Sequence, residues 1–182
     1  GDSAITFTDG TFTLSGGTFT STSNTLLMVT AYTSMTIFTV SGGTFVPNSG
    51  TVKFNGRANW STARIYTIDT PDLFEFNNVI LHQGAAKNSN TVAYTPVAGR
   101  TIVVKGNLTH GASEYANASG MSMINGLWNV EGDFTIGSDA AGATSGTTSI
   151  VTLTGSGAQV VTGDNLGYTT DLAINKAAGA VT

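Results

Sequence analysis

Residues 15–19 read Ser-Gly-Gly-Thr-Phe, and the same five residues return at positions 41–45, a step of 26. Similar steps lead from Phe54 to Leu81, from Leu81 to Val104 and from Val104 to Val130. Steps of roughly 23–27 residues are the length that one turn of a wide β-helix needs. The spacing therefore predicts a chain that coils upon itself, with each turn stacked on the one before.

Apolar and hydroxyl side chains alternate through most of the sequence between the glycines. Residues 5–8 read Ile-Thr-Phe-Thr, residues 11–14 read Thr-Phe-Thr-Leu, and residues 150–153 read Ile-Val-Thr-Leu. This period of two is typical of a strand with one buried face. Breaks such as Asp9-Gly10 and Asn55-Gly56 supply the positive φ that tight turns require. The pattern predicts about a dozen short strands and no long helix.

The predicted class is all-β, and two architectures fit it. The first is a parallel β-solenoid, in which inward positions form apolar ladders and outward positions form ladders of Thr, Ser and Asn. The second is a pair of tandem Ig-like β-sandwich domains, with about seven antiparallel strands in each. The recurring steps favour the solenoid, with turns of roughly 23–27 residues, and the sandwich pair is the alternative.

A longer repeat spans the whole chain. Residues 50–56 (Gly-Thr-Val-Lys-Phe-Asn-Gly) and the strand at 79–81 resemble residues 149–155 (Ser-Ile-Val-Thr-Leu-Thr-Gly) and the strand at 172–174. The sequence thus predicts a single β-solenoid over residues 1–182, made of two approximate repeats at about 1–95 and 96–182.

The composition predicts a polar surface with few charges. The 182 residues include 31 Thr, 16 Ser and 23 Gly but no Cys, only 10% are charged, and the net charge is −4. Charged residues usually make up about a quarter of a globular domain. Scattered Lys and Arg without a basic stripe argue against nucleic acid as a partner, and no apolar run is long enough for a membrane span. We expect an exported protein, extracellular or on the cell surface.

Two stretches near the end of the chain resemble a known module. Residues 151–163 read Val-Thr-Leu-Thr-Gly-Ser-Gly-Ala-Gln-Val-Val-Thr-Gly, and residues 171–182 read Asp-Leu-Ala-Ile-Asn-Lys-Ala-Ala-Gly-Ala-Val-Thr. Together they resemble the paired strands of tandem-repeat, β-rich bacterial surface proteins, the adhesin-like and haemagglutinin-like β-solenoids. The resemblance is degraded over residues 50–86. It implies an extracellular, repetitive chain with a structural or adhesive role, and it supplies no catalytic residues.

We interpret the chain as a structural subunit of an extracellular filament or cell-surface fibre. The end turns of a solenoid expose unpaired backbone groups, which natural solenoids cover with a helix or a polar loop. Here both ends are strand-like, and the repeat pattern would continue from Thr182 into the residues at the start. The expected partners are copies of the chain, joined end to end by β-strand pairing. The candidate assembly edges are Ile5, Phe7, Phe12, Ile174 and Val181.

The alternative function is an adhesin or carbohydrate-binding stalk module, with surface glycans as partners. An aromatic ring offers an apolar face against which a sugar ring can stack. Trp60 and Tyr66 are the candidates for this stacking. Alternating threonines in residues 6–22 suit an ice-binding face, but they do not recur at a constant step, so ice binding ranks lower.

A polysaccharide-active enzyme also ranks lower. Asp69, Asp72 and Glu75 are spaced by three, and a pair of carboxylates can act as acid and base on a glycoside. Pro71 between them favours a solvated corner loop instead. We therefore expect no enzyme and no catalytic residues.

The sequence predicts no cofactor and no metal ligands. His82 and His110 are the only histidines, and neither has another His or a Cys beside it, as a zinc site would require. Ca²⁺ is the one cofactor alternative, because turns such as Gly132-Asp133 are similar to those of calcium-binding repeats.

Overall fold

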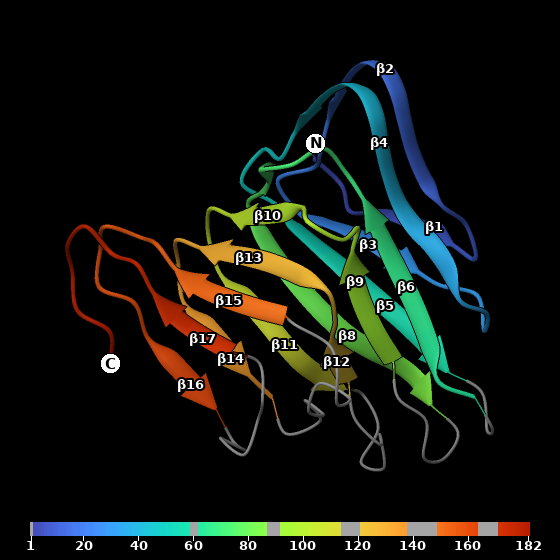
Figure 1. Ribbon diagram of the computed structural model, residues 1–182. Helices are drawn as coiled ribbons and strands as arrows, with labels where there is room; N and C mark the ends of the chain where they lie inside the picture. The colour runs from blue at the N-terminus through green and yellow to red at the C-terminus, as the bar shows by residue number, and fades with distance from the viewer. Residues whose placement is uncertain (1, 59–61, 87–91, 114–120, 138–148, 164–170) are drawn as a thin grey trace.

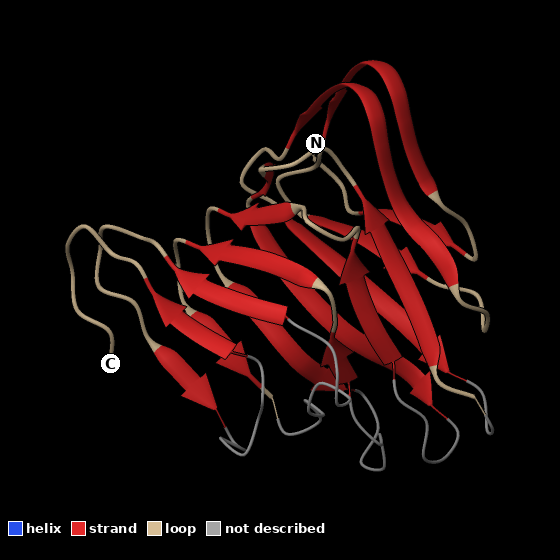
Figure 2. Ribbon diagram, viewed as in Figure 1, coloured by secondary structure: helices blue, strands red, loops and turns tan. Residues whose placement is uncertain are grey.

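The computed structural model describes residues 2–58, 62–86, 92–113, 121–137, 149–163 and 171–182. Every regular element in these ranges is a β-strand, and no helix occurs among them (Figure 2). The pairs within each sheet are parallel, so the chain comes back to the same side of the coil at every turn. The architecture is a parallel β-solenoid of one seven-stranded and two five-stranded sheets (Figure 1).

The seven-stranded sheet, called sheet I below, forms one side of the coil along its whole length. Its strands, in spatial order, are β1 (Ile5–Thr8), β3 (Thr25–Val29), β5 (Thr51–Ala58), β8 (Asn78–Ala86), β11 (Leu108–Ser113), β14 (Phe134–Ile136) and β16 (Val161–Gly163). The spatial order follows the chain order because each turn contributes one strand. The two edges of sheet I are therefore β1 in the first turn and β16 in the last.

The two five-stranded sheets form the other sides. Sheet II contains β7 (Phe74–Phe76), β10 (Thr101–Val104), β13 (Gly126–Val130), β15 (Ser149–Leu153) and β17 (Asp171–Ile174). Sheet III contains β2 (Phe12–Thr20), β4 (Met35–Val46), β6 (Arg64–Asp69), β9 (Val92–Pro96) and β12 (Met121–Met123). Sheet III thus begins in the first turns, and sheet II continues to the last.

The first turns have no separate strand in sheet II because β2 and β4 are long and bend round the corner (Figure 1). The bend falls at Gly17 and Gly43, whose φ angles of 71° and 78° suit glycine. A Cβ on Gly43 would lie 2.5 Å from the carbonyl oxygen of Gly17, so the two corners stack only without side chains. Beyond the bend the rings of Phe19, Phe45 and Phe74 follow one another at centroid distances of 5.8 and 5.4 Å, leading towards sheet II.

The core consists of ladders, because in-register parallel pairing places equivalent residues above one another. One ladder of sheet I runs through Ile5, Leu26, Val52, Val79, Leu108, Phe134 and Val161. Its five inner members are at most 3% exposed. Between the sheets, Phe38 stacks on Phe12 at a centroid distance of 4.6 Å and meets Phe54 edge-on at 6.0 Å. Apolar burial and ring contacts therefore join each turn to the next.

The structure confirms the predicted solenoid, and the alternative of two Ig-like sandwich domains is wrong because a sandwich requires antiparallel pairs. Phe19 pairs with Phe45, which confirms the step predicted from the two Ser-Gly-Gly-Thr-Phe motifs. Turn lengths, counted in residues, vary more widely than predicted. They run from 21 between Ile5 and Leu26 to 31 between Met35 and Tyr66.

One predicted step, from Leu81 to Val104, is wrong. Leu81 lies in sheet I and pairs with His110 in the next turn, whereas Val104 lies in sheet II and pairs with Phe76 and Val130. The two residues therefore belong to different ladders. The prediction fails because strands on two sides of the coil carry similar alternating patterns.

The long sequence repeat relates strands on different sides of the coil. In the first copy, β5 and β8 are neighbours in sheet I, and in the second copy β15 and β17 are neighbours in sheet II. Each pair consists of two strands one turn apart. The repeated sequence therefore corresponds to a strand and its neighbour one turn later. This pair lies in sheet I in the first copy and in sheet II in the second.

Phe38→Ala will destabilise the fold strongly, because Phe38 is fully buried at the centre of the ring cluster. We expect the free energy of unfolding to fall by about 3–5 kcal/mol, measured by urea denaturation. Thr39→Ala at the adjacent outward position is the control, with an expected change below about 1 kcal/mol. Equal losses in the two variants would contradict the inward position of Phe38.

Candidate functional site at the ends of the coil

The apolar ladders of sheet II end on exposed side chains in β17. One ladder runs through Ile102, Trp128 and Val151 to Leu172, and the other through Val104, Val130 and Leu153 to Ile174. The inner members are fully buried, but Leu172 is 46% and Ile174 is 61% exposed. A ladder residue is buried by the turns on both sides of it. The core at this end therefore lacks the cover that a further turn would give it within the described chain.

The predicted edge residue Val181 is less accessible than Ile174. It is half-buried, packs against the core and forms an isolated parallel bridge with Gln159. Val160, beside that bridge, is 44% exposed. The exposed apolar surface at this end thus comes from β17 and the residue that precedes β16.

The other end of the coil is formed by β1 and β2, which are edge strands of sheets I and III. Ile5 and Phe7 are the first members of two inward ladders, and both are half-buried. Phe12 is only 5% exposed, and its ring lies 5.8 Å from that of Phe7 and 4.6 Å from that of Phe38. These side chains point into the coil. The surface at this end therefore consists of the first residues of the apolar ladders and of the backbone edges of β1 and β2.

The structure therefore groups the predicted edge residues by end. Ile5, Phe7 and Phe12 lie in β1 and β2 of the first turn, whereas Ile174 lies in β17 and Val181 follows it in the last turn. Of these five, Ile174 alone exposes most of its side chain, while Phe12 is buried.

Lys176 holds the last turn to the one before it, a role that the sequence did not reveal. Its Nζ donates to the carbonyl oxygens of Gly155 and Gly157 at 2.6 and 2.8 Å and to Oε1 of Gln159 at 2.5 Å. The buried Gln159 carboxamide also donates from Nε2 to the carbonyl oxygen of Val130 at 3.0 Å. Both residues belong to the stretches that resemble surface-protein modules.

A second set of polar contacts joins successive turns at the corner between sheets II and I. Each of three side-chain oxygens accepts from a backbone N–H one turn further on: Asn78 from Asn107 at 2.9 Å, Asn107 from Asp133 at 2.8 Å, and Asp133 from Val160 at 2.8 Å. We call Asn78, Asn107 and Asp133 the corner ladder. A Cβ on Gly132 would lie 2.4 Å from Oδ1 of Asn107, so the corner requires glycine there. The pairs Gly106-Asn107 and Gly132-Asp133, which recur one turn apart, were its sequence signature.

Of the two residues predicted to stack on sugars, the structure describes only Tyr66. Trp60 lies outside the described residues. Tyr66 is fully buried, so its prediction as a sugar-stacking residue is wrong. Its hydroxyl donates to the carbonyl oxygen of Ala31 at 2.9 Å. Its ring packs 5.9 Å from that of Tyr94, whose hydroxyl accepts from the N–H of Gly56 at 2.6 Å. Burial raises the pKa of both phenols, so the tyrosines are neutral members of the core.

Two of the three carboxylates considered for catalysis connect neighbouring turns. Asp69 forms an ion pair with Arg100 at 2.6 Å. Asp72 accepts from the backbone N–H of Thr101 at 2.7 Å, and this hydrogen bond holds the pKa of Asp72 below its usual value. Glu75 lies in β7, opposite Val103 of β10. The carboxylates of Asp69 and Asp72 therefore have partners in the next turn, as expected for residues with a structural role at a corner.

The two histidines lie in different environments. His82 places Nδ1 2.9 Å from Oδ1 of Asn55. His110 occupies a core position of sheet I, between Leu81 and Ile136, and is 1% exposed. Its Nε2 has no hydrogen-bond partner among the described residues, and burial lowers its pKa from 6.5 to about 4. A neutral imidazole therefore takes the place that an aliphatic residue has in the adjacent turns.

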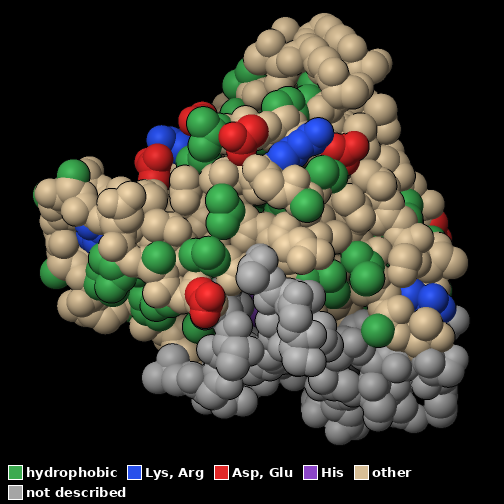
Figure 3. Space-filling view, viewed as in Figure 1, with side chains coloured by type: hydrophobic (Ala, Val, Ile, Leu, Met, Phe, Trp, Pro, Cys, Tyr) green, Lys and Arg blue, Asp and Glu red, His purple; other side chains and the backbone are tan. Residues whose placement is uncertain are grey.

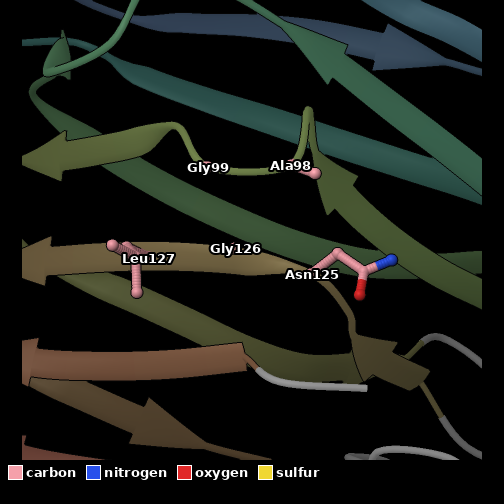
Figure 4. A pocket seen from close by; sticks show the side chains of 5 residues that line it. All are labelled: Ala98, Gly99, Asn125, Gly126 and Leu127. Carbon is pink, nitrogen blue, oxygen red and sulfur yellow. The ribbon is translucent and has the colours of Figure 1, made fainter. Parts of the chain in front are cut away.

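The surface offers shallow features rather than a deep cleft in the described part. Charged side chains are few on the face shown in Figure 3, and only some of them lie near charges of opposite sign, as in the pairs Arg100–Asp69 and Lys105–Glu131. A hollow of about 250 Å³ is lined by Ala98, Gly99, Asn125, Gly126 and Leu127, between the β9–β10 turn and the start of β13 (Figure 4). Among the described residues, no three His, Cys, Asp or Glu side chains gather as a metal site requires.

Comparisons with protein families, curated proteins and solved structures found no match to this chain. Within the residues that the structure describes, no helix has the length and hydropathy to cross a membrane.

Acid will destabilise the protein through His110. The folded-state pKa of about 4 lies below the ordinary value of 6.5, so the contribution of the neutral ring is complete above pH 6.5 and is lost as the pH falls towards 4. This loss amounts to about 3 kcal/mol of unfolding free energy. Urea denaturation at neutral and acidic pH checks it, with His110→Leu as the control.

The leucine variant retains every carboxylate and His82, so its pH dependence isolates His110. We expect wild type to lose about 3 kcal/mol more than His110→Leu over this range. Identical pH profiles of the two proteins would show that His110 is not buried in its neutral form.

Lys176→Met will loosen the last turn, because three oxygens lose the ammonium that joins them. We expect a local cost of about 1–2 kcal/mol and faster hydrogen exchange at the amides of Gly155 and Thr182, which donate to Gln159. Lys105→Met, which removes an exposed ion pair with Glu131, is the control and should leave these amides unchanged. Unchanged exchange in Lys176→Met would contradict the proposed role of Lys176.

Proposed function

We propose that this protein is a structural subunit of an extracellular filament or cell-surface fibre, in which copies of the coil are joined end to end by β-strand pairing. The observation that carries the proposal is the exposure of Leu172 and Ile174 at the end of ladders whose inner members are fully buried. A second coil stacked on this end would bury them as each turn buries the one before.

The register of sheet I supports a head-to-tail joint. Val161 of β16 and Ile5 of β1 belong to one ladder, and both strands run in the same direction. Residues 180–182 already cover the start of this edge, since the N–H of Val161 donates to the carbonyl oxygen of Thr182 at 2.8 Å and Val181 bridges to Gln159. In this proposal the β1 of a copy pairs with the remaining part of β16, Thr162 and Gly163, and continues sheet I beyond residues 180–182. On the neighbouring side, β17 would face the part of β2 that carries Phe19 and leads towards sheet II.

Such a joint uses different surfaces on the two copies, so it remains open at both ends and produces a fibre rather than a closed ring when successive copies keep the same axis. Each backbone hydrogen bond across it would contribute about 0.5–1.5 kcal/mol. Apolar burial at Leu172 and Ile174 would add to that.

The surface composition supports an exported location and a passive role. Thr, Ser and Gly are abundant, Cys is absent, and charged residues make up only 10% of the chain. In this proposal the chain itself is not an enzyme, because Asp69 and Asp72 serve to brace turns. Its partners are further copies of the chain.

Ile174→Lys will weaken assembly while leaving the fold intact, since Ile174 is 61% exposed and a charge on an edge strand opposes strand addition. Losing the burial of one such side chain costs about 2 kcal/mol, or roughly thirty-fold in the association constant. Sedimentation velocity over a concentration series and electron micrographs of the purified protein measure this.

The matched control is Leu73→Lys, because Leu73 is 60% exposed but lies in the loop before β7, which belongs neither to the first turn nor to the last. We expect this variant to assemble as wild type does. Folded wild-type protein that stays monomeric at every concentration would overturn the proposal, and equal weakening by both variants would overturn the assigned surface.

A further inference from the structure

The chain contains two Asn-Gly pairs, Asn55-Gly56 and Asn125-Gly126, and the structure treats them very differently. Asparagine followed by glycine is the sequence most open to intramolecular cyclisation, because glycine has no side chain to hinder the approach of its backbone nitrogen to the preceding carboxamide. The reaction requires an accessible carboxamide and a backbone that can reorient. The surroundings of each pair therefore decide whether it reacts in the folded protein.

Asn55 is half-buried, and its side chain is held by residues of the next turn. Its Oδ1 lies 2.9 Å from Nδ1 of His82, and the carboxamide packs so closely on Gly84 that a Cβ there would lie 2.1 Å from Oδ1. The nitrogen of Gly56, which would have to attack, donates at 2.6 Å to the buried hydroxyl of Tyr94. Reaction at this pair would require the core to open.

Asn125 is in the opposite situation. Its side chain is exposed at a bend between β12 and β13, where its φ of 50° lies in the left-handed region that Asn tolerates. Figure 4 shows the carboxamide at the rim of the hollow, with its nitrogen and oxygen pointing away from the ribbon of β13. The carboxamide has no hydrogen-bond partner within the described residues. Neither burial nor a hydrogen bond to a neighbouring turn protects the Asn125 carboxamide, although Gly126 itself is buried at the start of β13.

We propose that Asn125 is a site of spontaneous, non-enzymatic deamidation in the folded protein. The nitrogen of Gly126 bonds to Cγ of Asn125, the bond from Cγ to Nδ2 breaks, and ammonia leaves with the proton from the Gly126 nitrogen. Water then opens the resulting succinimide at either carbonyl and gives aspartate or isoaspartate. Both products carry a carboxylate, and the isoaspartate also inserts an extra carbon into the backbone.

The position makes the change structurally significant. The residue before Asn125 is tied to sheet III, since the N–H of Ile124 donates to the carbonyl oxygen of Tyr94 at 2.9 Å. The residue after it packs against Pro96, where a Cβ on Gly126 would lie 2.6 Å from Cγ of the proline ring. A lengthened backbone between these two contacts would shift the start of β13 and lower the stability of the coil.

The experiment incubates the folded protein at mildly alkaline pH and follows both pairs by peptide mapping and mass spectrometry, which detect the exchange of NH2 for OH. We expect Asn125 to react at least about tenfold faster than Asn55, because reaction at Asn55 must first break buried hydrogen bonds. In protein unfolded by urea the two rates should converge. Asn125→Gly keeps the left-handed backbone, removes the carboxamide and should abolish the fast reaction.

Equal rates in the folded protein, or a faster reaction at Asn55, would overturn the proposal. So would an Asn125 that reacts in urea but not in the folded chain, because the bend would then protect it. Aged wild-type protein should also unfold at a lower urea concentration than aged Asn125→Gly. If the two aged proteins keep identical midpoints after Asn125 has reacted, the structural consequence proposed for β13 is wrong.

Discussion

In-register parallel pairing between successive turns is the constraint on which the rest of this molecule depends. Because each residue lies above its equivalent one turn earlier, similar side chains must stack. A single polar or badly fitting residue therefore weakens the packing of its whole ladder. The ladder from Leu26 through Val52 and Val79 to Leu108 satisfies this with aliphatic residues that are almost fully buried. His110 is tolerated in a neighbouring ladder only as a neutral ring, because a charged imidazolium at this buried position would lose its hydration.

The corners obey the same constraint with different chemistry. Where the backbone must approach itself from turn to turn, side chains are excluded, as at Gly43 above Gly17. Where a turn leaves backbone N–H groups unpaired, the corner ladder of Asn78, Asn107 and Asp133 accepts them, and Lys176 does the converse by donating to carbonyl oxygens. Polar residues in this fold thus satisfy the backbone at corners, while apolar residues join the sides.

A structure held together by contacts between adjacent turns has no inherent end, and this links the fold to the proposed function. The same ladder positions that bury Val151 and Leu153 leave Leu172 and Ile174 exposed at β17. The strand pairing and apolar burial that join successive turns within the chain are therefore the same interactions that would join a second copy. The sides of the coil carry few charges and some exposed apolar side chains, such as Ile65 and Leu127, and Tyr66 is buried where a sugar-binding platform would need it exposed.

The sequence by itself determined the local regularities: strands from the period of two, corners from glycine, and the length of a turn from the Ser-Gly-Gly-Thr-Phe motifs, since these arise from backbone geometry along the chain. It could not assign strands to sides, because a strand in sheet I and one in sheet II carry the same alternation; Leu81 and Val104 were joined for that reason. Tertiary structure alone decided the burial of Tyr66 and His110 and the meeting of Lys176 with Gln159, because the partners of each side chain come from other turns. Those partners depend on the length of every intervening corner, which no local pattern records.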